Sequence, residues 1–233
     1  MDRRQFNSLC LAGATLVAMA SHKAHALSIS ELSNTDASKG LKLALEKGAL
    51  SAVNVLGATN GFLGNEKVRI QLPGYLQDAA NLLRTFGQGT KVDELVTAMN
   101  RGAEAAMPMA KDLLLKAVNT MSVQDAKGIL SGTNTAATDY FSSKTRSALA
   151  QKFLPAVTQA TATVGLADKY NQIAGKAAEM GLVKKDDANI EQYVTGKALD
   201  GLFLMISEEE KKIRQNPVGY GSNILTKVFG VLK

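Results

Sequence analysis

The chain has 233 residues, a net charge of +6 and no tryptophan, and its single cysteine and both histidines fall within the first 25 positions. The rest of the chain therefore lacks the commonest general base, the thiol nucleophile and the soft metal ligands, which excludes most familiar catalytic and transition-metal sites. Basic residues are spread along the sequence without forming a block, so we expect no nucleic-acid partner, no cofactor and no metal.

Residues 1–26 are predicted to be a cleaved export signal. The pair Arg3-Arg4 precedes an apolar run over 9–20, and a small-residue cleavage pattern follows at 24–26. The run is too short to span a bilayer core of about 30 Å, so no transmembrane helix is expected after cleavage. We expect a periplasmic protein; the arginine pair leaves both the twin-arginine route and the general secretory route open.

Residues 27–233 are predicted to form a single helical domain. Removing 26 residues leaves 207, with 24 Lys and Arg against 20 Asp and Glu. Alanine, leucine, lysine, glutamate and methionine dominate, and only four prolines interrupt this helical propensity. We expect an all-α monomer: one bundle of about seven to nine helices, several kinked or split at prolines.

The first helix is expected to begin near 36–38, and the glycine-rich segment 57–65 should be a loop. Apolar and polar residues alternate over 68–72, which predicts a short extended piece and the only plausible strand. Pro73 should end this piece and open a second helix, which stops at the glycines of 87–89.

A helical stretch over 91–121 is interrupted by Pro108, which must kink or split it. Ser122 followed by Asp125 indicates a variant capping box, which opens a short helix ending at Gly132.

The next helix should run from Thr135 to a second kink or break at Pro155, with helical segments at 156–164 and 166–180 after it. A charged hinge is predicted at 184–187.

A strongly apolar helix is expected from Ile190 to a point before Pro217, followed by an amphipathic segment at 224–229. Several glycines inside the expected helices imply close helix contacts, since each is less favourable than alanine there. They are Gly48, Gly102, Gly175, Gly196 and Gly201.

Eight blocks occur in an order that resembles the bacterial domain-of-unknown-function family 4197. They are LKLALEKG at 41–48, GFL at 61–63, IQLP at 70–73, MNR at 99–101, DAKGIL at 125–130, AATDYF at 136–141, ALDGLF at 198–203 and EEKKIR at 209–214. The resemblance covers about residue 36 to Gly230 and implies a helical, exported protein of the Gram-negative envelope. It implies no activity. Many members carry a lipoprotein signal that this chain departs from, so lipid anchoring does not carry over.

Asn100, Arg101 and Glu104 lie within little more than one helical turn, beside the expected break at Pro108. They form either a polar binding site in a groove or an ordinary ion pair with Arg101 and Glu104 at i, i+3.

Another candidate binding site consists of Asp139 and Tyr140, which lie near Lys144 and Arg146 in the sequence. This grouping predicts either a hydrogen-bonding cluster or an ordinary helix surface.

Asp200 is flanked by glycines on the most apolar helix, so we expect it to be partly buried with Lys197 or Arg214 as a partner. The acids at 208–210 and at 186–191 have no calcium-loop spacing, and they are interpreted as a solvated charged face. The scattered methionines favour core filling over an adaptable pocket.

Two functions remain open. The first is a non-catalytic helical protein that binds an apolar or amphipathic envelope component, a lipid-like molecule or a protein, in a groove between helices. The second is a carboxylate-dependent hydrolase or lyase acting on envelope glycans, with Glu104 and Asp200 as the candidate catalytic pair.

Overall fold

The computed structural model describes residues 34–184 and 187–216, and within these ranges the protein is all-α, without a strand. The elements are α1 (Asn34–Gly57), η1 (Gly74–Leu76), α2 (Gln77–Thr85), α3 (Gly89–Ala106), η2 (Met107–Met109), α4 (Ala110–Asn119), α5 (Val123–Ser131), α6 (Ala136–Thr161), α7 (Gly165–Glu179) and α8 (Ile190–Gln215), where η marks a 3-10 helix. The expected export signal and the amphipathic segment at 224–229 lie outside the described residues, as does part of the charged hinge.

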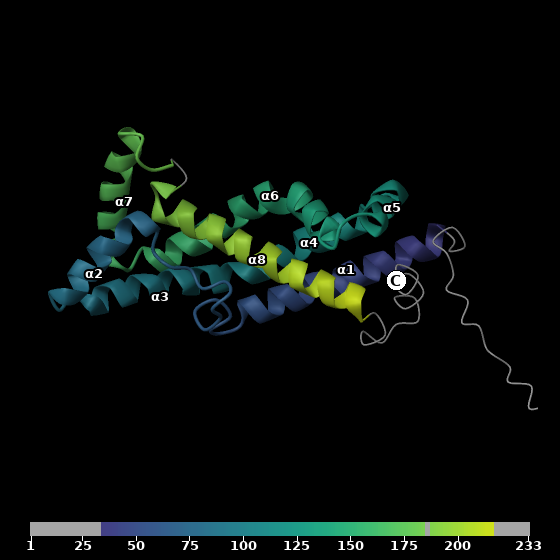
Figure 1. Ribbon diagram of the computed structural model, residues 1–233, viewed down its shortest axis with the longest axis horizontal. Coiled ribbons are helices and arrows are strands. Elements are labelled where there is room, and N and C mark those ends of the chain that lie inside the picture. Colours follow the sequence, from purple (N-terminus) through teal and green to yellow (C-terminus); the bar gives the residue numbers. More distant parts are fainter. Residues whose placement is uncertain (1–33, 185–186, 217–233) are drawn as a thin grey trace, which may run out of the picture.

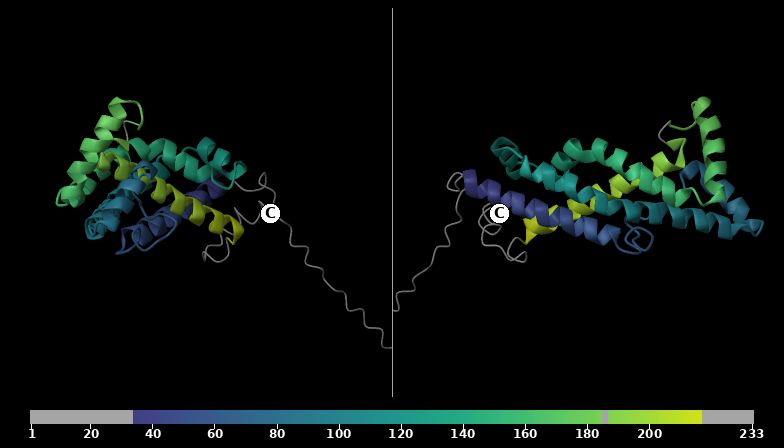
Figure 2. Two further views of the ribbon diagram at one scale, coloured as in Figure 1. Left: turned by 60° about the vertical axis from the view of Figure 1, so that its left-hand side comes forward. Right: turned by 180° about the vertical axis from the view of Figure 1, so that it is seen from behind.

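The helices form an elongated bundle in which α1, α3 and α8 follow the long axis (Figure 1). The most extensive contacts join α3 to α6, α6 to α8 and α1 to α8. Helices α2 and α7 gather at one end of the bundle, and α7 stands across the long axis in Figure 1 and in the view from behind (Figure 2). Within the described ranges, no helix combines the length and the apolar character that crossing a membrane requires.

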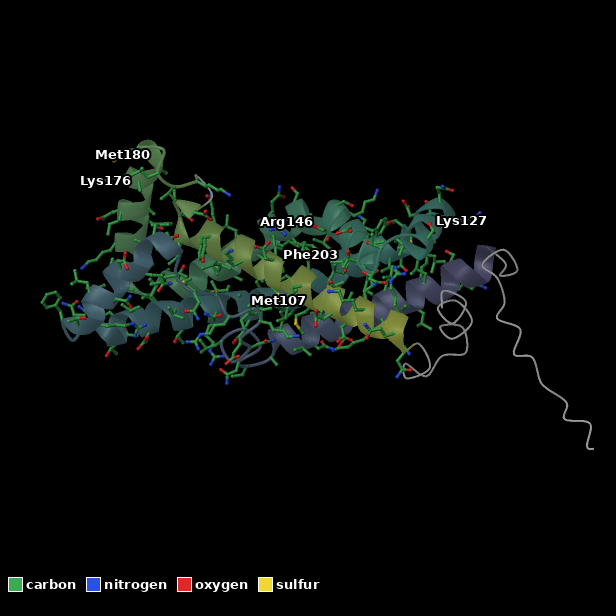
Figure 3. The ribbon with its side chains drawn as sticks, in the orientation of Figure 1. Met107, Lys127, Arg146, Lys176, Met180 and Phe203 are labelled. Atoms are coloured by element: carbon green, nitrogen blue, oxygen red, sulfur yellow. The ribbon has the colours of Figure 1, made fainter. Side chains whose placement is uncertain are left out.

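Buried apolar side chains form one cluster that runs through the bundle. Phe62, Phe141 and Phe153 are completely buried in it, and they come from the loop after α1 and from two positions on α6. Met107 in η2 is also fully buried, near the centre of the bundle (Figure 3). Packing in this continuous core holds the helices together.

Of the two prolines predicted to kink or break a helix, Pro108 interrupts the helical stretch and Pro155 does not. Pro108 lies in η2, so the predicted split of the 91–121 stretch is confirmed. Pro155 lies inside α6, which continues to Thr161 without a break, so the separate segment predicted at 156–164 is wrong. Pro155 and Gln151, four residues before it, are both exposed, so water can reach the carbonyl that loses its donor.

Several of the predicted helix start and end signals are confirmed. Ser122 and Asp125 form a complete reciprocal capping box at the start of α5, because each side chain accepts from the other residue's backbone N–H. Pro73 precedes η1, and the turn after α2 contains Gly87 at φ +73°, a left-handed conformation that glycine adopts without strain.

The glycines divide into two groups. At Gly102, an added Cβ would lie 3.2 Å from the Val157 Cα of α6, so the predicted close helix contact is confirmed there. At Gly201 it would lie 2.7 Å from the Phe62 ring, which is a close contact with the loop after α1 and not with a helix. Gly175 and Gly196 have open space within 4 Å of such a Cβ, so the prediction is wrong for them.

Candidate functional site

Glu104 on α3 is buried, with 6% of its side chain exposed, and both of its oxygens are engaged. Oε1 accepts from the backbone N–H groups of Phe62 and Leu63, each at 3.1 Å. Oε2 accepts from Arg101 at 2.5 Å, so the predicted i, i+3 pair is confirmed, and Arg101 also donates to Asn60 at 2.9 Å. The carboxylate therefore holds the loop after α1 against α3.

Asn100 fixes the segment around Ile70, which belongs to the same connection between α1 and η1. It is fully buried, and its Oδ1 accepts from the N–H of Ile70 at 2.8 Å while its Nδ2 donates to the Ile70 carbonyl at 2.9 Å and to the Val96 carbonyl at 2.7 Å. The segment 68–72 is therefore not a strand: one amide side chain makes the bonds that a neighbouring strand would make.

Asp200 is not the partly buried acid that the sequence predicted. Its side chain is 55% exposed on α8, since Leu199 and Gly201 on either side of it take the buried positions. Arg146 of α6 binds it at 2.6 Å, and Lys197 is 4.0 Å away. The other suggested partner, Arg214, binds elsewhere.

The candidate catalytic pair is not brought together by any shared contact. Glu104 is buried and bonded to the loop after α1, whereas Asp200 faces solvent and is bonded to α6. Within the described residues, no group of three histidine, cysteine, aspartate or glutamate side chains could hold a metal ion.

The hydrogen-bonding cluster suggested around Asp139 and Tyr140 does not form, because its residues have different surroundings. Asp139 is exposed, and the hydroxyl of Tyr140 donates to the Ala117 carbonyl at 3.1 Å. The Lys144 ammonium lies 5.8 Å from the Tyr140 ring centroid, but Arg146 faces α8. Tyr140 connects α6 with α4 and Arg146 connects α6 with α8, so the four residues form no common site.

Glu210 was missed, because the acids at 208–210 were interpreted as a solvated face. It is 6% exposed, and its carboxylate accepts from the backbone N–H groups of Ala137 and Thr138 at 3.1 and 3.0 Å and from the Thr138 hydroxyl at 2.9 Å. Arg214, one turn later, binds it at 2.9 Å. The i, i+4 spacing of Glu210 and Arg214 was the only sequence signal for this site.

A group of tyrosines ties α7 to its surroundings, and the sequence did not indicate it. The hydroxyls of Tyr75 and Tyr170 each donate to the Asp187 carbonyl at 2.9 Å and lie 3.1 Å from one another. Burial raises the pKa of Tyr170 well above 10, and it raises the pKa of Tyr193, which donates to the Gln71 carbonyl at 2.8 Å, to about 12.

Beside these tyrosines, α2, α3 and α7 enclose an apolar groove of about 70 Å³. Its lining is formed by Leu72, Leu76, Ala79, Ala80, Leu83, Val92, Leu95, Leu166, Lys169, Tyr170 and Ile173. Ile173 is 57% exposed at its edge. No methionine lines it: Met99 and Met107 are core residues, and Met180 is exposed at the far tip of α7 (Figure 3).

The sequence comparisons give a family and nothing more specific. A family model described as "Protein of unknown function (DUF4197)" matches residues 31–230. No curated protein and no solved structure matches the chain.

Proposed function

Because the chain belongs to the DUF4197 family, which is described as of unknown function, we propose a function from the chemistry of its own surface. The protein is a non-catalytic helical binding protein for an amphipathic envelope molecule, exported to the periplasm and active there. Its site is the groove between α2, α3 and α7.

The apolar lining of that groove is the observation that carries the proposal. Ten of the lining side chains are aliphatic or aromatic, and the one charged residue, Lys169, can keep its ammonium group in water while its stem packs on the wall. The volume of about 70 Å³ is roughly half of the ~150 Å³ of an engineered apolar cavity that holds benzene. The groove therefore suits the narrow end of an acyl chain better than a ring system.

The mouth of the groove favours an anionic head group. Lys169 and Leu166 also line a neighbouring hollow of about 290 Å³, together with Lys91 and Glu94. Two lysines against one glutamate leave this hollow with a net positive charge. An acyl chain in the groove would place its carboxylate or phosphate in this hollow.

Exposed apolar side chains surround the same end of the bundle. Leu82 and Phe86 are 58% and 72% exposed at the end of α2, and Met180 and Leu182 are 74% and 73% exposed after α7. They add exposed apolar surface to α2 and to the end of α7, two of the helices that form the groove.

The test is a titration of the mature protein with dodecanoate, followed by amide chemical shifts. We expect shifts confined to α2, α3 and α7, and a loss of binding in Ile173→Asn. Val55→Asn is the matched control, because Val55 is also a β-branched helical residue, 48% exposed and outside the groove. Equal binding by both variants, or none by the wild type, would contradict the proposal.

The alternative, a carboxylate-dependent hydrolase or lyase, has less support. Both oxygens of Glu104 are occupied by internal donors, and Asp200 is held at the surface by Arg146. Cleavage of envelope glycans by the wild type, lost in a folded Asp200→Asn variant, would favour this alternative over binding.

The export part of the proposal has its own test. The intact mass of protein recovered from the periplasm of its source cells should correspond to a chain that begins near residue 27. A mass that retains residues 1–26 would refute cleavage. Replacing Arg3 and Arg4 with lysines should block export only if the twin-arginine route is used.

A further inference from the structure

A hollow of about 330 Å³ lies between the segment 67–71 and α8, and its lining is rich in cationic side chains. Lys67 and Arg69 come from the segment, and Lys197 comes from α8. Among the described residues that line it, Asp200 is the one acid. Three cations against one carboxylate give the hollow a net positive charge, which attracts anions.

Asp200 does not neutralise the α8 wall of this hollow. Its carboxylate binds Arg146 of α6 at 2.6 Å, and the Lys197 ammonium lies farther away, at 4.0 Å. Lys197 also lies 5.7 Å from the centroid of the Tyr193 ring, within the range of a cation–π contact. Because one carboxylate is shared by two cations, positive charge is left over at this wall.

The opposite wall, formed by the segment 67–71, also has more positive than negative charge. Lys67 lies 3.0 Å from Glu208, and Lys211 lies 3.7 Å from the same carboxylate, so this acid is shared by two cations as well. Positive charge therefore remains on both walls, and an anion between them would be attracted from two sides.

Arg69 is the cation of the lining that is best placed to bind a ligand. Its side chain is exposed, and its guanidinium donates no hydrogen bond to any described residue. The acid that attracts it at longer range, Asp93, already binds Arg84 at 2.7 Å, and this bond lowers the pKa of Asp93. A guanidinium presents a planar set of donors that can bind two oxygens of a phosphate group at once.

The backbone that carries Arg69 is held in place by two helices. Asn100 of α3 binds both the N–H and the carbonyl of Ile70, at 2.8 and 2.9 Å. The next carbonyl, that of Gln71, accepts from the Tyr193 hydroxyl of α8 at 2.8 Å. The segment therefore keeps its position relative to α8 without a ligand, which reduces the entropic cost of binding one.

We infer that the hollow between the segment 67–71 and α8 binds a phosphomonoester group, with Arg69, Lys67 and Lys197 as the residues that contact it. Such a group carries between one and two negative charges at pH 7 and three acceptor oxygens, which match the surplus of cations and donors. A soluble phosphate ester and a lipid head group share this chemistry. The site is independent of the proposed acyl-chain site, since the hollow shares no lining residue with the apolar groove or with its mouth.

The test is a titration of the mature protein with inorganic phosphate and with glycerol phosphate at constant ionic strength, followed by amide chemical shifts. We expect shifts in the segment 67–71 and around Gly201 of α8. Arg69→Gln and Lys197→Gln should each weaken binding by about tenfold, because each removes a charged donor. Lys127→Gln is the matched control, since Lys127 is also an exposed helical lysine but lies on α5, outside the hollow (Figure 3).

Asp200→Asn should have the opposite effect and strengthen phosphate binding, because it removes the acid that competes for Lys197. The inference is overturned if this variant binds phosphate no better than the wild type, or if Arg69→Gln binds as well as the Lys127→Gln control.

Vesicles distinguish the two sources of the phosphate group. Binding to phosphatidate vesicles but not to phosphatidylcholine vesicles, lost in Arg69→Gln, would identify a lipid head group as the ligand. Binding of glycerol phosphate without binding to either kind of vesicle would identify a soluble ester. If neither the small phosphates nor the phosphatidate vesicles bind, the inference is wrong.

Discussion

The middle of the bundle and its α2–α7 end differ in the side chains that they bury. Polar side chains are buried in the middle, and apolar side chains are exposed at the α2–α7 end. In the middle, Glu104 and Asn100 are buried and every oxygen is bonded to a backbone or arginine N–H. At the α2–α7 end, Phe86 and Ile173 are largely exposed. The buried acids therefore stabilise the fold, while apolar side chains that the core does not take up lie at the surface of the α2–α7 end. In this protein, candidate function is better sought in its grooves than in its buried carboxylates.

The largest expected effect comes from removing the central carboxylate. Glu104→Ala leaves the N–H groups of Phe62 and Leu63 without an acceptor and should lower the free energy of unfolding by about 2–4 kcal/mol. Urea denaturation measures this loss. Glu46→Ala, at an exposed position of α1, should change stability by less than about 0.5 kcal/mol. Similar values for the two variants would contradict a structural role for the buried carboxylate of Glu104.

The second comparison uses two glycines. Gly201→Ala should destabilise the protein by about 1–3 kcal/mol, because the new methyl group meets the Phe62 ring at 2.7 Å in a fully buried site. Gly175→Ala on α7 should stabilise it by about 0.5–1 kcal/mol, since the space is open and alanine favours the helix. Thermal melts of the two variants should shift in opposite directions, and shifts of the same sign would contradict this picture of their packing.

The smallest effect concerns alkaline pH. The folded protein keeps the protons of Tyr170 and Tyr193 because burial raises their pKa, whereas the unfolded chain releases them near pH 10. The contribution of these two tyrosines to the stability of the folded protein is therefore complete below pH 10 and decreases as the pH rises. For Tyr193 the decrease extends from pH 10 to about 12. Urea midpoints should decrease from pH 9 to 11.

Tyr170→Phe removes the bond to the Asp187 carbonyl, so its free energy of unfolding at pH 8 should be about 1 kcal/mol lower than that of the wild type. Above pH 9 its free energy of unfolding should decrease less steeply with pH than that of the wild type. A parallel decrease in both proteins would show that other groups control the alkaline transition.

Much of the fold could be predicted because its signals are local. The capping box at Ser122 and the split at Pro108 depend on residues a few positions apart. The continuous helix through Pro155 depends on solvent reaching its exposed side, and the conformation of 68–72 depends on Asn100, thirty residues from its partner Ile70. Neither property is contained in a short stretch of sequence.

The site could be predicted less well for the same reason. Arg101 and Glu104 were paired correctly because they share a helical turn. Asp200 was misplaced, since the apolar character of α8 does not reveal which of its sides faces solvent. The apolar groove requires the relative placement of α2, α3 and α7, which no short stretch of sequence specifies.

The bond between Glu210 and the start of α6 also limits how helices can slide. Thr135, at the N-cap of α6, makes no side-chain capping bond, so the cap comes from α8. Moving α8 by one turn, about 5.4 Å, would bring Ile206 or Arg214 to that place. The first has no acceptor and the second is repelled by the positive end of the helix dipole. Helices α6 and α8 are thereby held in one lengthwise register.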